Sequence, residues 1–299
     1  MKKKILLSAA NGPIMKSLIM QLKKNNFYIV GIDTNKIGLA SKFCDEFYQS
    51  PSGSSKDFLN FVSKIAKKVE CVFLYVDEEL DNLSKNITNF PSLQKKIILS
   101  PRETIQICNN KNDFNYFFKN KNIKLPSIRF RGMNIIKPAI GRGAKNILIT
   151  DERNVIKMFK ENPKYLTQKY IVGMEFTVDC VFDKKGDLVF GLPRKRILSQ
   201  NVSIVGKVVK HKKILSEIKK ISSYLKFYGP INFQFIENKK GLWLIEINPR
   251  LSGSVIFSIK SGFNPIEMSY QIHQNKKITF PKKINYKETH IRFWESVSQ

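Results

Sequence analysis

The sequence is poor in the residues that build disulfide frameworks, thiolate metal sites and membrane spans. Its 299 residues include four cysteines, which are scattered and form no C-x-x-C pair; this excludes a disulfide framework and predicts reduced thiols. No apolar run approaches the ~20 residues that cross a bilayer. The apolar run near the start ends at Asn11-Gly12-Pro13, too soon for a signal peptide. We therefore expect a cytoplasmic protein.

Arginine and histidine are also scarce. Nine of the 52 basic residues are Arg, while Lys is spread along the whole chain and gives a net charge of +28. Nucleic-acid sites favour clustered Arg with interleaved aromatic side chains, and no segment has that composition, so we expect no nucleic-acid partner. The charge instead favours anionic substrates. The three histidines lie too far apart to predict a catalytic pair.

The first third of the chain alternates short apolar runs with helical patterns. The runs are 5–8, 27–32, 71–76 and 96–99, and helical spacing of apolar residues separates them. Strands joined by helices of this size predict a parallel sheet with right-handed crossovers. Asp33 ends the second run, where dinucleotide-binding proteins keep a ribose-binding acid. Because Gly12 stands alone and no G-x-G-x-x-G is present, a dehydrogenase is a minor alternative.

The stretch 241–254, Gly-Leu-Trp-Leu-Ile-Glu-Ile-Asn-Pro-Arg-Leu-Ser-Gly-Ser, contains the strongest functional signal. Alternation along a strand places Glu246 and Asn248 on one face and predicts that Trp243, Ile245 and Ile247 face a core. A carboxylate beside an amide oxygen suits magnesium, and Arg250 follows at once. Metal ligands next to a guanidinium can hold phosphate oxygens. An edge strand with solvated polar residues is the alternative.

Other segments supply complementary chemistry. The strand around Gln234 is expected to pair with the strand of Glu246, so that Gln234 shares its polar face if the register permits. Lys137 precedes Pro138 and is therefore extended, and a loop with Gly141 and Gly143 follows, which could close over a triphosphate or only form a hairpin turn. Arg194 and Arg196 lie two apart on an extended segment and could bind an anion or serve as a basic edge strand.

These segments, in this order, resemble the ATP-grasp ligases, and especially one half of the large subunit of carbamoyl-phosphate synthase. The resemblance implies an α/β architecture: a Rossmann-like pre-ATP-grasp domain over 1–99, then a two-lobed α+β ATP-grasp domain over 100–299 with its small lobe at about 124–171. Two features depart from the family. Lys169 stands where many relatives have Glu, and the stretch from Pro126 to Lys137 leaves little room for the usual small-lobe helix.

The resemblance also assigns roles to residues. Magnesium or manganese would be bound by Glu246, Asn248 and Gln234, and Arg250, Arg194 and Arg196 would contact the substrate or its acyl phosphate. ATP would be contacted by Lys111, Lys137, Gly141, Gly143 and Ala144 at the phosphates, by Gln168, Tyr170 and Ile171 at the adenine, and by Glu175 at the ribose. Asp77, Glu78 and Glu79 match an acidic run of the family or simply begin a helix.

The implied function is an ATP- and Mg²⁺-dependent ligase that joins a carboxylate to an amine, or to a thiol, through an acyl phosphate, releasing ADP and phosphate. The alternative is a non-catalytic module that binds a nucleotide or an anion on the same fold. We expect small-molecule carboxylate and amine substrates and no membrane partner, and the sequence leaves a homodimer open.

Overall fold

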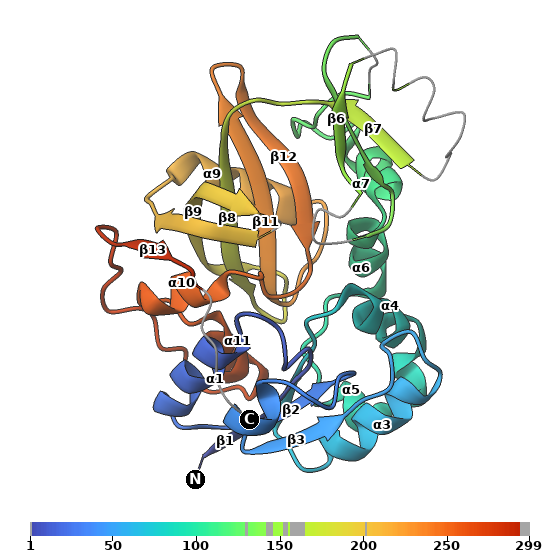
Figure 1. Ribbon diagram of the computed structural model, residues 1–299, viewed down its shortest axis with the longest axis vertical. Helices are drawn as coiled ribbons and strands as arrows, with labels where there is room; N and C mark the ends of the chain where they lie inside the picture. The colour runs from blue at the N-terminus through green and yellow to red at the C-terminus, as the bar shows by residue number, and fades with distance from the viewer. Residues whose placement is uncertain are drawn as a thin grey trace.

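Three sheets organise the chain, and the computed structural model describes residues 2–128, 131–141, 146–151, 155, 165–200 and 202–293. The N-terminal sheet lies at the bottom of Figure 1, the large sheet above it, and the small sheet at the upper right. The predicted mixed α/β class, with a parallel sheet first and antiparallel sheets after it, is confirmed. No helix among the described residues is long and apolar enough to cross a membrane.

The N-terminal sheet has the order β3-β2-β1-β4, and the described pairings are parallel. The predicted strand at 96–99 is reduced to one bridge, Val72 to Ile97, and the strand Glu46–Gln49 was not predicted. The elements of this part are β1 (Lys3–Leu7), α1 (Met15–Lys24), β2 (Phe27–Asp33), α2 (Ala40–Phe43), β3 (Glu46–Gln49), α3 (Asp57–Ala66), β4 (Cys71–Phe73), α4 (Asp77–Asn86), the 3₁₀ turn η1 (Ile87–Asn89) and α5 (Pro91–Gln94).

Two helices then form a column beside the sheets, as Figure 1 shows. They are α6 (Arg102–Asn109) and α7 (Lys111–Phe118). The small sheet that follows has the order β6-β5-β7 and is antiparallel. Its strands are β5 (Asn134–Pro138), β6 (Leu148–Thr150) and β7 (Tyr165–Lys169).

The large antiparallel sheet has the order β12-β11-β8-β9-β10-β13. Its elements and the helices that pack on it are β8 (Met174–Phe182), β9 (Leu188–Gln200), β10 (Val202–Val208), α9 (Lys212–Ser222), β11 (Gly229–Asn238), β12 (Gly241–Asn248), α10 (Val255–Lys260), α11 (Pro265–His273) and β13 (Thr289–Ile291). The predicted alternation of β8 is confirmed, since its inward residues are all buried in one core with α7 and α9: Phe176, Val178, Cys180 and Phe182.

The alternation predicted for β12 is wrong in its first half. Leu242 and Leu244 join the core together with Ile247, whereas Trp243 and Ile245 are only half-buried. The reason is a β-bulge: Gln234 lies opposite Glu246 but its neighbour Phe235 lies opposite Leu244, so that one residue of β12 has no counterpart. An extra residue reverses the facing of everything before it.

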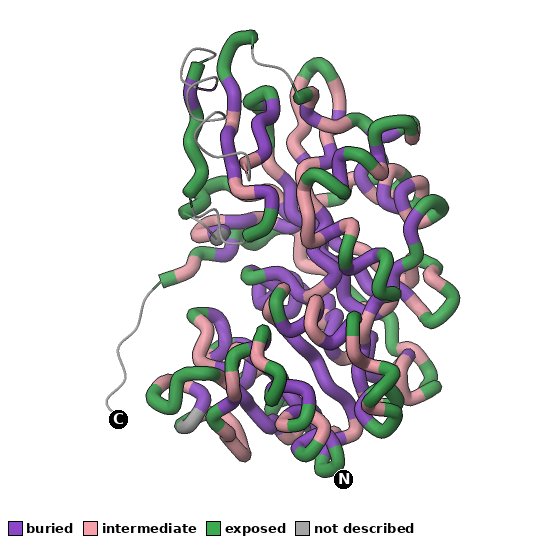
Figure 2. The backbone as a smooth tube through the Cα atoms, turned by 90° about the vertical axis from the view of Figure 1, so that its right-hand side faces the viewer, coloured by how far each residue is buried: buried purple, intermediate pink, exposed green. Residues whose placement is uncertain are grey.

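The N-terminal sheet shares a core with the C-terminal helices. One of its faces packs against α1 and also against residues from the end of the chain: Leu251, Val255, Ile256, Phe257, Ile259, Ile266 and Tyr270. Its other face packs against α3 and α4. Figure 2 shows that buried residues concentrate in the interior of the molecule and exposed residues at its rim. The predicted boundary between residues 99 and 100 stays a prediction, because this core joins the two parts.

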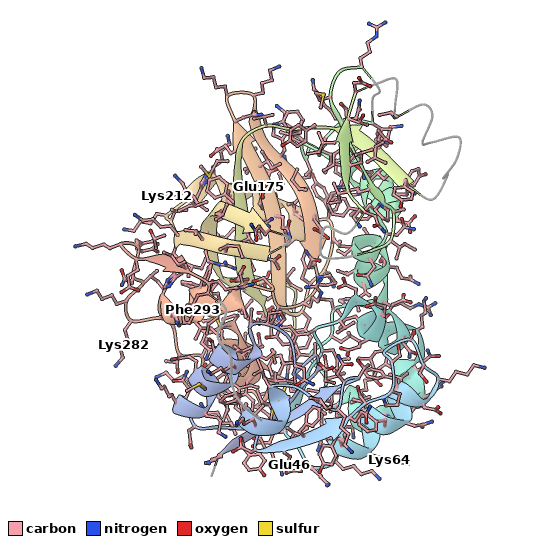
Figure 3. All side chains as sticks on the ribbon, in the orientation of Figure 1. Glu46, Lys64, Glu175, Lys212, Lys282 and Phe293 are labelled. Atoms are coloured by element: carbon pink, nitrogen blue, oxygen red, sulfur yellow. The ribbon has the colours of Figure 1, made fainter. Side chains whose placement is uncertain are left out.

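The lysine excess lies largely on solvated faces. Lys64, Lys212 and Lys282 belong to three separate segments, and each points outward from the rim of the molecule (Figure 3). This scatter agrees with charge distributed over the surface rather than gathered in one basic patch.

Candidate functional site

The paired strands β11 and β12 bring three predicted metal ligands together. Gln234 lies directly opposite Glu246, and Asn232 directly opposite Asn248. Directly opposed residues of an antiparallel pair have Cβ atoms roughly 5 Å apart and share a face. Asn232 uses its amide to donate to the Thr177 hydroxyl at 2.7 Å. Gln234, Glu246 and Asn248 are thus grouped in the part of the hairpin that lies away from its turn.

This donor set suits a hard cation. It offers one carboxylate and two amide oxygens, which are ligands that magnesium accepts alongside substrate phosphates and water. Among the described residues, no group of three or more His, Cys, Asp or Glu side chains could hold a metal by itself, so a thiolate or histidine site is not an alternative in this part of the chain. The amide oxygen of Asn248 also accepts from Arg250 at 3.2 Å, and its second lone pair is left for another partner.

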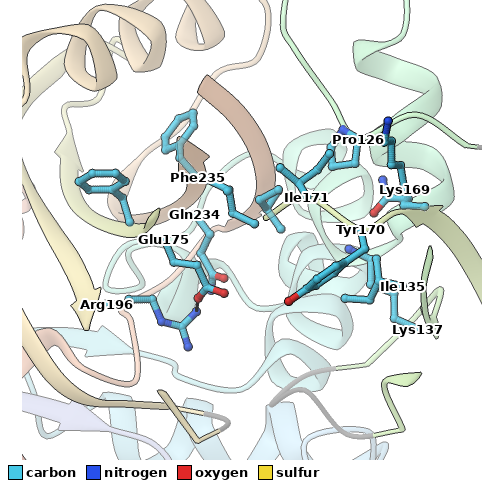
Figure 4. Close-up of a pocket in the computed structure, with 14 residues that line it drawn as sticks. Pro126, Ile135, Lys137, Lys169, Tyr170, Ile171, Glu175, Arg196, Gln234 and Phe235 are labelled. Atoms are coloured by element: carbon cyan, nitrogen blue, oxygen red, sulfur yellow. Dashed lines mark ion pairs between the residues drawn. The ribbon is translucent and has the colours of Figure 1, made fainter. Parts of the chain in front are cut away.

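A cavity of about 130 Å³ adjoins this hairpin and is shown in Figure 4. Gln234 and the bulged residue Ile245 line one side, and the small sheet lines the other. In Figure 4 the Tyr170 side chain points across the cavity toward Gln234 and Glu175. The cavity is lined by residues from four separate segments that the sequence motifs predicted as site residues: Lys137, Gln168, Tyr170, Ile171, Glu175, Arg196 and Gln234.

Lys137 is the most deeply buried of the cationic residues that line this cavity. It lies on β5 with 7% of its surface exposed. Burial lowers the pKa of its ammonium to about 8; the Glu246 carboxylate opposes this shift, and the Lys111 charge adds to it. Lys137 lines the same cavity as Gln234, and Gln234 lies directly opposite Glu246. The amine and the predicted metal pair therefore belong to one site.

Lys111 approaches the same region from the column of helices. Its Nζ donates to the Gly141 carbonyl at 2.9 Å, and its backbone amide donates to the Ala139 carbonyl at 2.9 Å. The start of α7 is thereby attached to the loop that follows Lys137. The predicted phosphate contacts Gly143 and Ala144 lie outside the described residues.

Gln168 is buried in the cavity wall. It is 3% exposed, and its side-chain NH₂ donates to the Asn115 oxygen at 2.9 Å. Asn115, on α7, in turn donates to the Lys111 carbonyl. Sequence reasoning missed Asn115, because nothing in the aromatic pattern of α7 distinguishes this amide from a solvated one. The link fixes the β7 strand to the helix that carries Lys111.

Glu175 and Arg196 form an ion pair at the cavity mouth. Their closest atoms are 3.2 Å apart, and Figure 4 marks the pair. Glu175 is nearly half exposed, so its carboxylate has a free side toward a hydroxyl-bearing ligand. Arg196 lines the cavity that also contains the predicted adenine contacts, and its predicted contact with a substrate stays a prediction.

Arg194 is the most deeply buried of the predicted arginines. It is 1% exposed and donates to Asp179 at 2.7 Å, Ser252 at 3.0 Å and Ser254 at 2.9 Å. Asp179 also accepts from Ser258. Direct contact of Arg194 with a substrate stays a prediction; its observed contacts hold the loop that follows Arg250. Sequence reasoning missed Asp179, since its partner lies on a different strand.

Arg250 is held by a carboxylate from the N-terminal part. Its Nε and Nη2 donate to the two Asp77 oxygens at 2.5 and 3.1 Å. Burial alone lowers the pKa of the guanidinium, but the Asp77 charge and hydrogen bonds outweigh it, so that the pKa is raised. The acidic run at 77–79 therefore both begins α4 and reaches the site. Asp77 and Arg250 are 173 residues apart in the sequence, so no local pattern could pair them.

The side-chain carboxylate of Asp33, at the end of β2, is hydrogen-bonded to backbone amides. The Asp33 oxygens accept from the amides of Asn11 at 3.0 Å and Asn35 at 2.9 Å. These bonds fix the loop after β1. They give no support to a ribose contact at Asp33.

A family model described as "ATP-grasp in the biosynthetic pathway with Ter operon" matches residues 161–292. Carbamoyl phosphate synthase large chains are relatives: that of Clostridium perfringens (strain 13 / Type A) is 26% identical over 301 residues, which are 87% of this chain and 27% of the relative. That of Clostridium botulinum (strain Loch Maree / Type A3) is 34% identical over 152 residues, 44% of this chain and 14% of the relative. This chain therefore contains an ATP-grasp domain and is homologous to carbamoyl phosphate synthase large chains.

Solved structures show the same fold for this ATP-grasp chain. N5-carboxyaminoimidazole synthetase from Staphylococcus aureus has a TM-score of 0.75 at 16% identity, covering 97% of this chain and 82% of the other. An L-amino acid ligase from Bacillus licheniformis has a TM-score of 0.72 at 14% identity, covering 96% and 78%. These identities show the fold alone. The chain spans about a quarter or less of the curated relatives' length.

Proposed function

We propose that this ATP-grasp protein is an ATP- and magnesium-dependent ligase that joins a carboxylate to an amine through an acyl phosphate. The observation that supports this most is that Gln234, which lines the same cavity as Lys137, lies directly opposite Glu246 on the paired strand. The side-chain oxygens of Gln234 and Glu246 could bind a divalent cation, and the buried Lys137 ammonium could bind phosphate oxygens at the same site. A protein that only held a nucleotide's adenine would need neither.

The protein's contribution is mainly positioning and charge. Lys137 and Lys111 bind phosphate oxygens of ATP, Gln168, Tyr170 and Ile171 surround the adenine, and Glu175 accepts from the ribose. Gln234, Glu246 and Asn248 would hold magnesium, which would neutralise charge at the phosphates. Arg250 stabilises the anionic acyl phosphate from beside this set, and Asp77 fixes the orientation of its guanidinium.

The ligation then proceeds in two chemical steps, in each of which atoms and electrons balance. A carboxylate oxygen attacks the γ-phosphorus, and ADP leaves with the electron pair of the broken P–O bond. The neutral amine nitrogen attacks the acyl carbon, and phosphate leaves with the carboxylate's original oxygen. The amine's proton goes to phosphate or solvent.

The test is a screen for ADP release across carboxylates, with hydroxylamine as the acceptor, because hydroxylamine converts acyl phosphates into coloured hydroxamates. We expect one class of carboxylate to give both ADP and hydroxamate in equal amounts. Glu246→Gln should abolish both, and Asp187→Asn, which removes a carboxylate from the exposed β8–β9 turn, should change neither.

Three other results would contradict the proposed ligase, its metal site or its intermediate. ATP binding without ADP release in the presence of any carboxylate supports the non-catalytic module. ADP release that is unaffected by Glu246→Gln contradicts the assigned metal site. If the substrate carboxylate is labelled with ¹⁸O and no label appears in the phosphate released, the acyl phosphate is contradicted.

A further inference from the structure

The loop 250–254, which begins with Arg250, is held by two further arginines. Arg194 on β9 donates to the side chains of two of its serines at 3.0 and 2.9 Å. Arg292, which directly follows β13, donates through Nη2 to the Gly253 carbonyl at 2.7 Å. Figure 1 shows β13 beside α10, the helix that follows this loop. The loop of the proposed reaction site is therefore in contact with guanidinium groups from two different strands.

Arginine is concentrated at this loop, although lysine dominates the rest of the chain. Nine of the 52 basic residues are arginines, and six of the nine lie in the part that the structure describes: Arg102, Arg131, Arg194, Arg196, Arg250 and Arg292. Three of these six are at the loop 250–254. A lysine supplies charge, whereas a planar guanidinium also offers paired N–H donors that match a carboxylate or a phosphate. The choice of arginine here therefore indicates recognition of such a group.

Arg292 differs from the other two arginines because it lacks a carboxylate partner. Arg194 is paired with Asp179, and Arg250 with Asp77, but no Asp or Glu in the described part of the chain forms an ion pair with Arg292. Its Nη1 is buried and has no hydrogen-bond partner there. Burial, together with the nearby Arg194 charge, lowers the pKa of its guanidinium, although arginine stays charged at neutral pH. An unpaired buried donor is unfavourable, and an anionic ligand would offset that cost.

The Arg292 guanidinium is held in a fixed orientation but can still be approached. Its Cζ and that of Arg194 each lie 5.9 Å from the centre of the Phe257 ring, and the same ring stacks on His290 at 5.4 Å. Arg292 is only half-buried, and Gly253, which accepts its hydrogen bond, is exposed and has no side chain. A ligand could therefore reach the guanidinium beside Gly253.

This guanidinium is close to the proposed reaction site. Gly253 lies three residues after Arg250, so that their Cα atoms are at most ~11 Å apart. Arg250 is the residue that we propose stabilises the acyl phosphate. A small molecule with two anionic groups could therefore contact Arg250 with one of them and Arg292 with the other.

A row of opposed residues also joins the predicted metal ligands to this region. Gln234 lies opposite Glu246 on one side and opposite Thr177 on the other. Thr177 in turn lies opposite Arg194. Directly opposed residues share a face of the sheet, and the Arg194 and Arg292 guanidiniums lie at the same Phe257 ring. Arg292 therefore lies next to the end of the row that begins at the metal ligands.

We propose that Arg292 binds a second anionic group, a carboxylate or a phosphate, of the acid that the ligase activates. The inference rests on the proposed ligase function and adds the class of the acid substrate. The reacting carboxylate lies at Arg250, and the second anionic group lies against the Arg292 guanidinium beside Gly253. This group supplies the charge partner that Arg292 lacks within the described part of the chain.

The test is a binding comparison with the full chain in the presence of magnesium and a non-hydrolysable ATP analogue. The probes are butanoate, succinate and 3-phosphonopropanoate, which share a carboxylate and a chain length and end in a methyl, a carboxylate and a phosphonate group. Hexanoate and adipate repeat the comparison at a greater length. Titration calorimetry should show, at one of the two lengths, a dianion that binds about tenfold or more tightly than its matched monoanion, since one opposite charge at 4–6 Å favours an ion by about that factor. Either dianion supports the inference, and the tighter of the two identifies the group as a carboxylate or a phosphate.

Variants connect this preference to Arg292. Arg292→Gln should remove most of the dianion's advantage and leave the affinities for the monoanion and the ATP analogue unchanged. Arg292→Lys keeps the charge without the paired donors and should retain part of the advantage. Arg102→Gln is the matched control, because Arg102 is exposed at the start of α6, and it should change none of these affinities.

Three results overturn the inference. The first is equal affinity for monoanion and dianion at both lengths. The second is an advantage of the dianion that survives in Arg292→Gln. The third is an equal loss of affinity for monoanion and dianion in Arg292→Gln, because the arginine would then only position the loop of Arg250.

Failure of this inference is distinguishable from failure of the proposed function. If hydroxamate and ADP form with a carboxylate while monoanions and dianions bind alike, the ligase stands and the class of the acid is wrong. If no carboxylate yields ADP, the ligase itself is wrong, and the inference about its acid substrate falls with it whatever the probes do.

Discussion

In the proposed function, Lys137 binds a triphosphate from a buried position, and it must be charged to do so. Burial brings the pKa of its ammonium down to about 8, so the side chain is protonated below that pH and neutral above it. A bound phosphate favours the protonated form, and the lysine is therefore charged in the complex over a wider range than in the free protein.

This predicts a pH dependence of nucleotide binding. Because the free protein loses the Lys137 proton as the pH rises through about 8, ADP affinity should fall toward a tenfold loss per pH unit above it. Lys137→Arg keeps its charge throughout and should bind with little change from pH 7 to 9.5. Calorimetric titrations across that range test this, and a wild-type profile as flat as the variant's would contradict it.

The Asp77–Arg250 pair gives a second prediction. Both side chains are largely buried, 22% and 13% exposed, and removing one partner leaves the other charge poorly compensated. We expect Asp77→Asn to lower the free energy of unfolding by about 1–3 kcal/mol, measured by urea denaturation. Asp187→Asn is the matched control and should cost less than 0.5 kcal/mol, which is roughly the limit for surface substitutions. Equal losses would mean that the pair adds nothing.

At the scale of elements, the linker between β7 and β8 joins the two walls of the cavity that we propose for the nucleotide. It contains Tyr170 and Ile171 and passes close to β11 at Gly173, where an added Cβ would lie 2.4 Å from the Glu237 carbonyl. Real Cβ atoms do not approach a backbone oxygen so closely. Gly173 is therefore required for the linker to reach its position.

We predict that Gly173→Ala displaces the linker and weakens ADP binding at least about tenfold, because a displaced backbone loses its contacts with the base. Gly186→Ala is the control: its φ of +94° makes alanine strained there, but it lies in the β8–β9 turn, away from the cavity. Both variants should lose stability, and only Gly173→Ala should lose affinity. A Gly173→Ala protein with wild-type affinity would be incompatible with this account.

Elements also show how far the sequence determines the site. Periodicity predicted the helices α1, α3, α7 and α9 and the inward face of β8, since each buries one continuous face. It failed at β12, because a bulge is one unpaired residue and leaves no mark in composition. It also could not find Asn115, Asp179 or the bond from Asp77 to Arg250, since these contacts join elements distant in the sequence.

At the scale of the whole molecule, the shared core connects the N-terminal sheet to the last two helices. Leu251, Ile256 and Ile266 are buried against α1 and β1, and Tyr270 donates to Glu70 across the same contact. The loop of Arg250 and the residue Asp77 are held at opposite sides of this junction. The position of the guanidinium therefore depends on both parts.

We therefore predict that residues 100–299 do not fold alone. Removal of residues 1–99 would expose the apolar faces of α10 and α11, an area far larger than a stable monomer leaves in water. The fragment should be insoluble or lack a cooperative thermal transition, measured by circular dichroism. Adding residues 1–99 as a separate chain should restore the transition. A fragment that unfolds cooperatively by itself would contradict the shared core.

The central claim is that Gln234, Glu246 and Asn248 hold a divalent ion beside Lys137, where it contacts the phosphates of ATP. The most direct measurement is the magnesium dependence of ADP affinity in wild type and Glu246→Gln, with Asp187→Asn as control. We predict that magnesium tightens ADP binding in the wild type and the control but not in Glu246→Gln. The same magnesium dependence in all three proteins would contradict the claim.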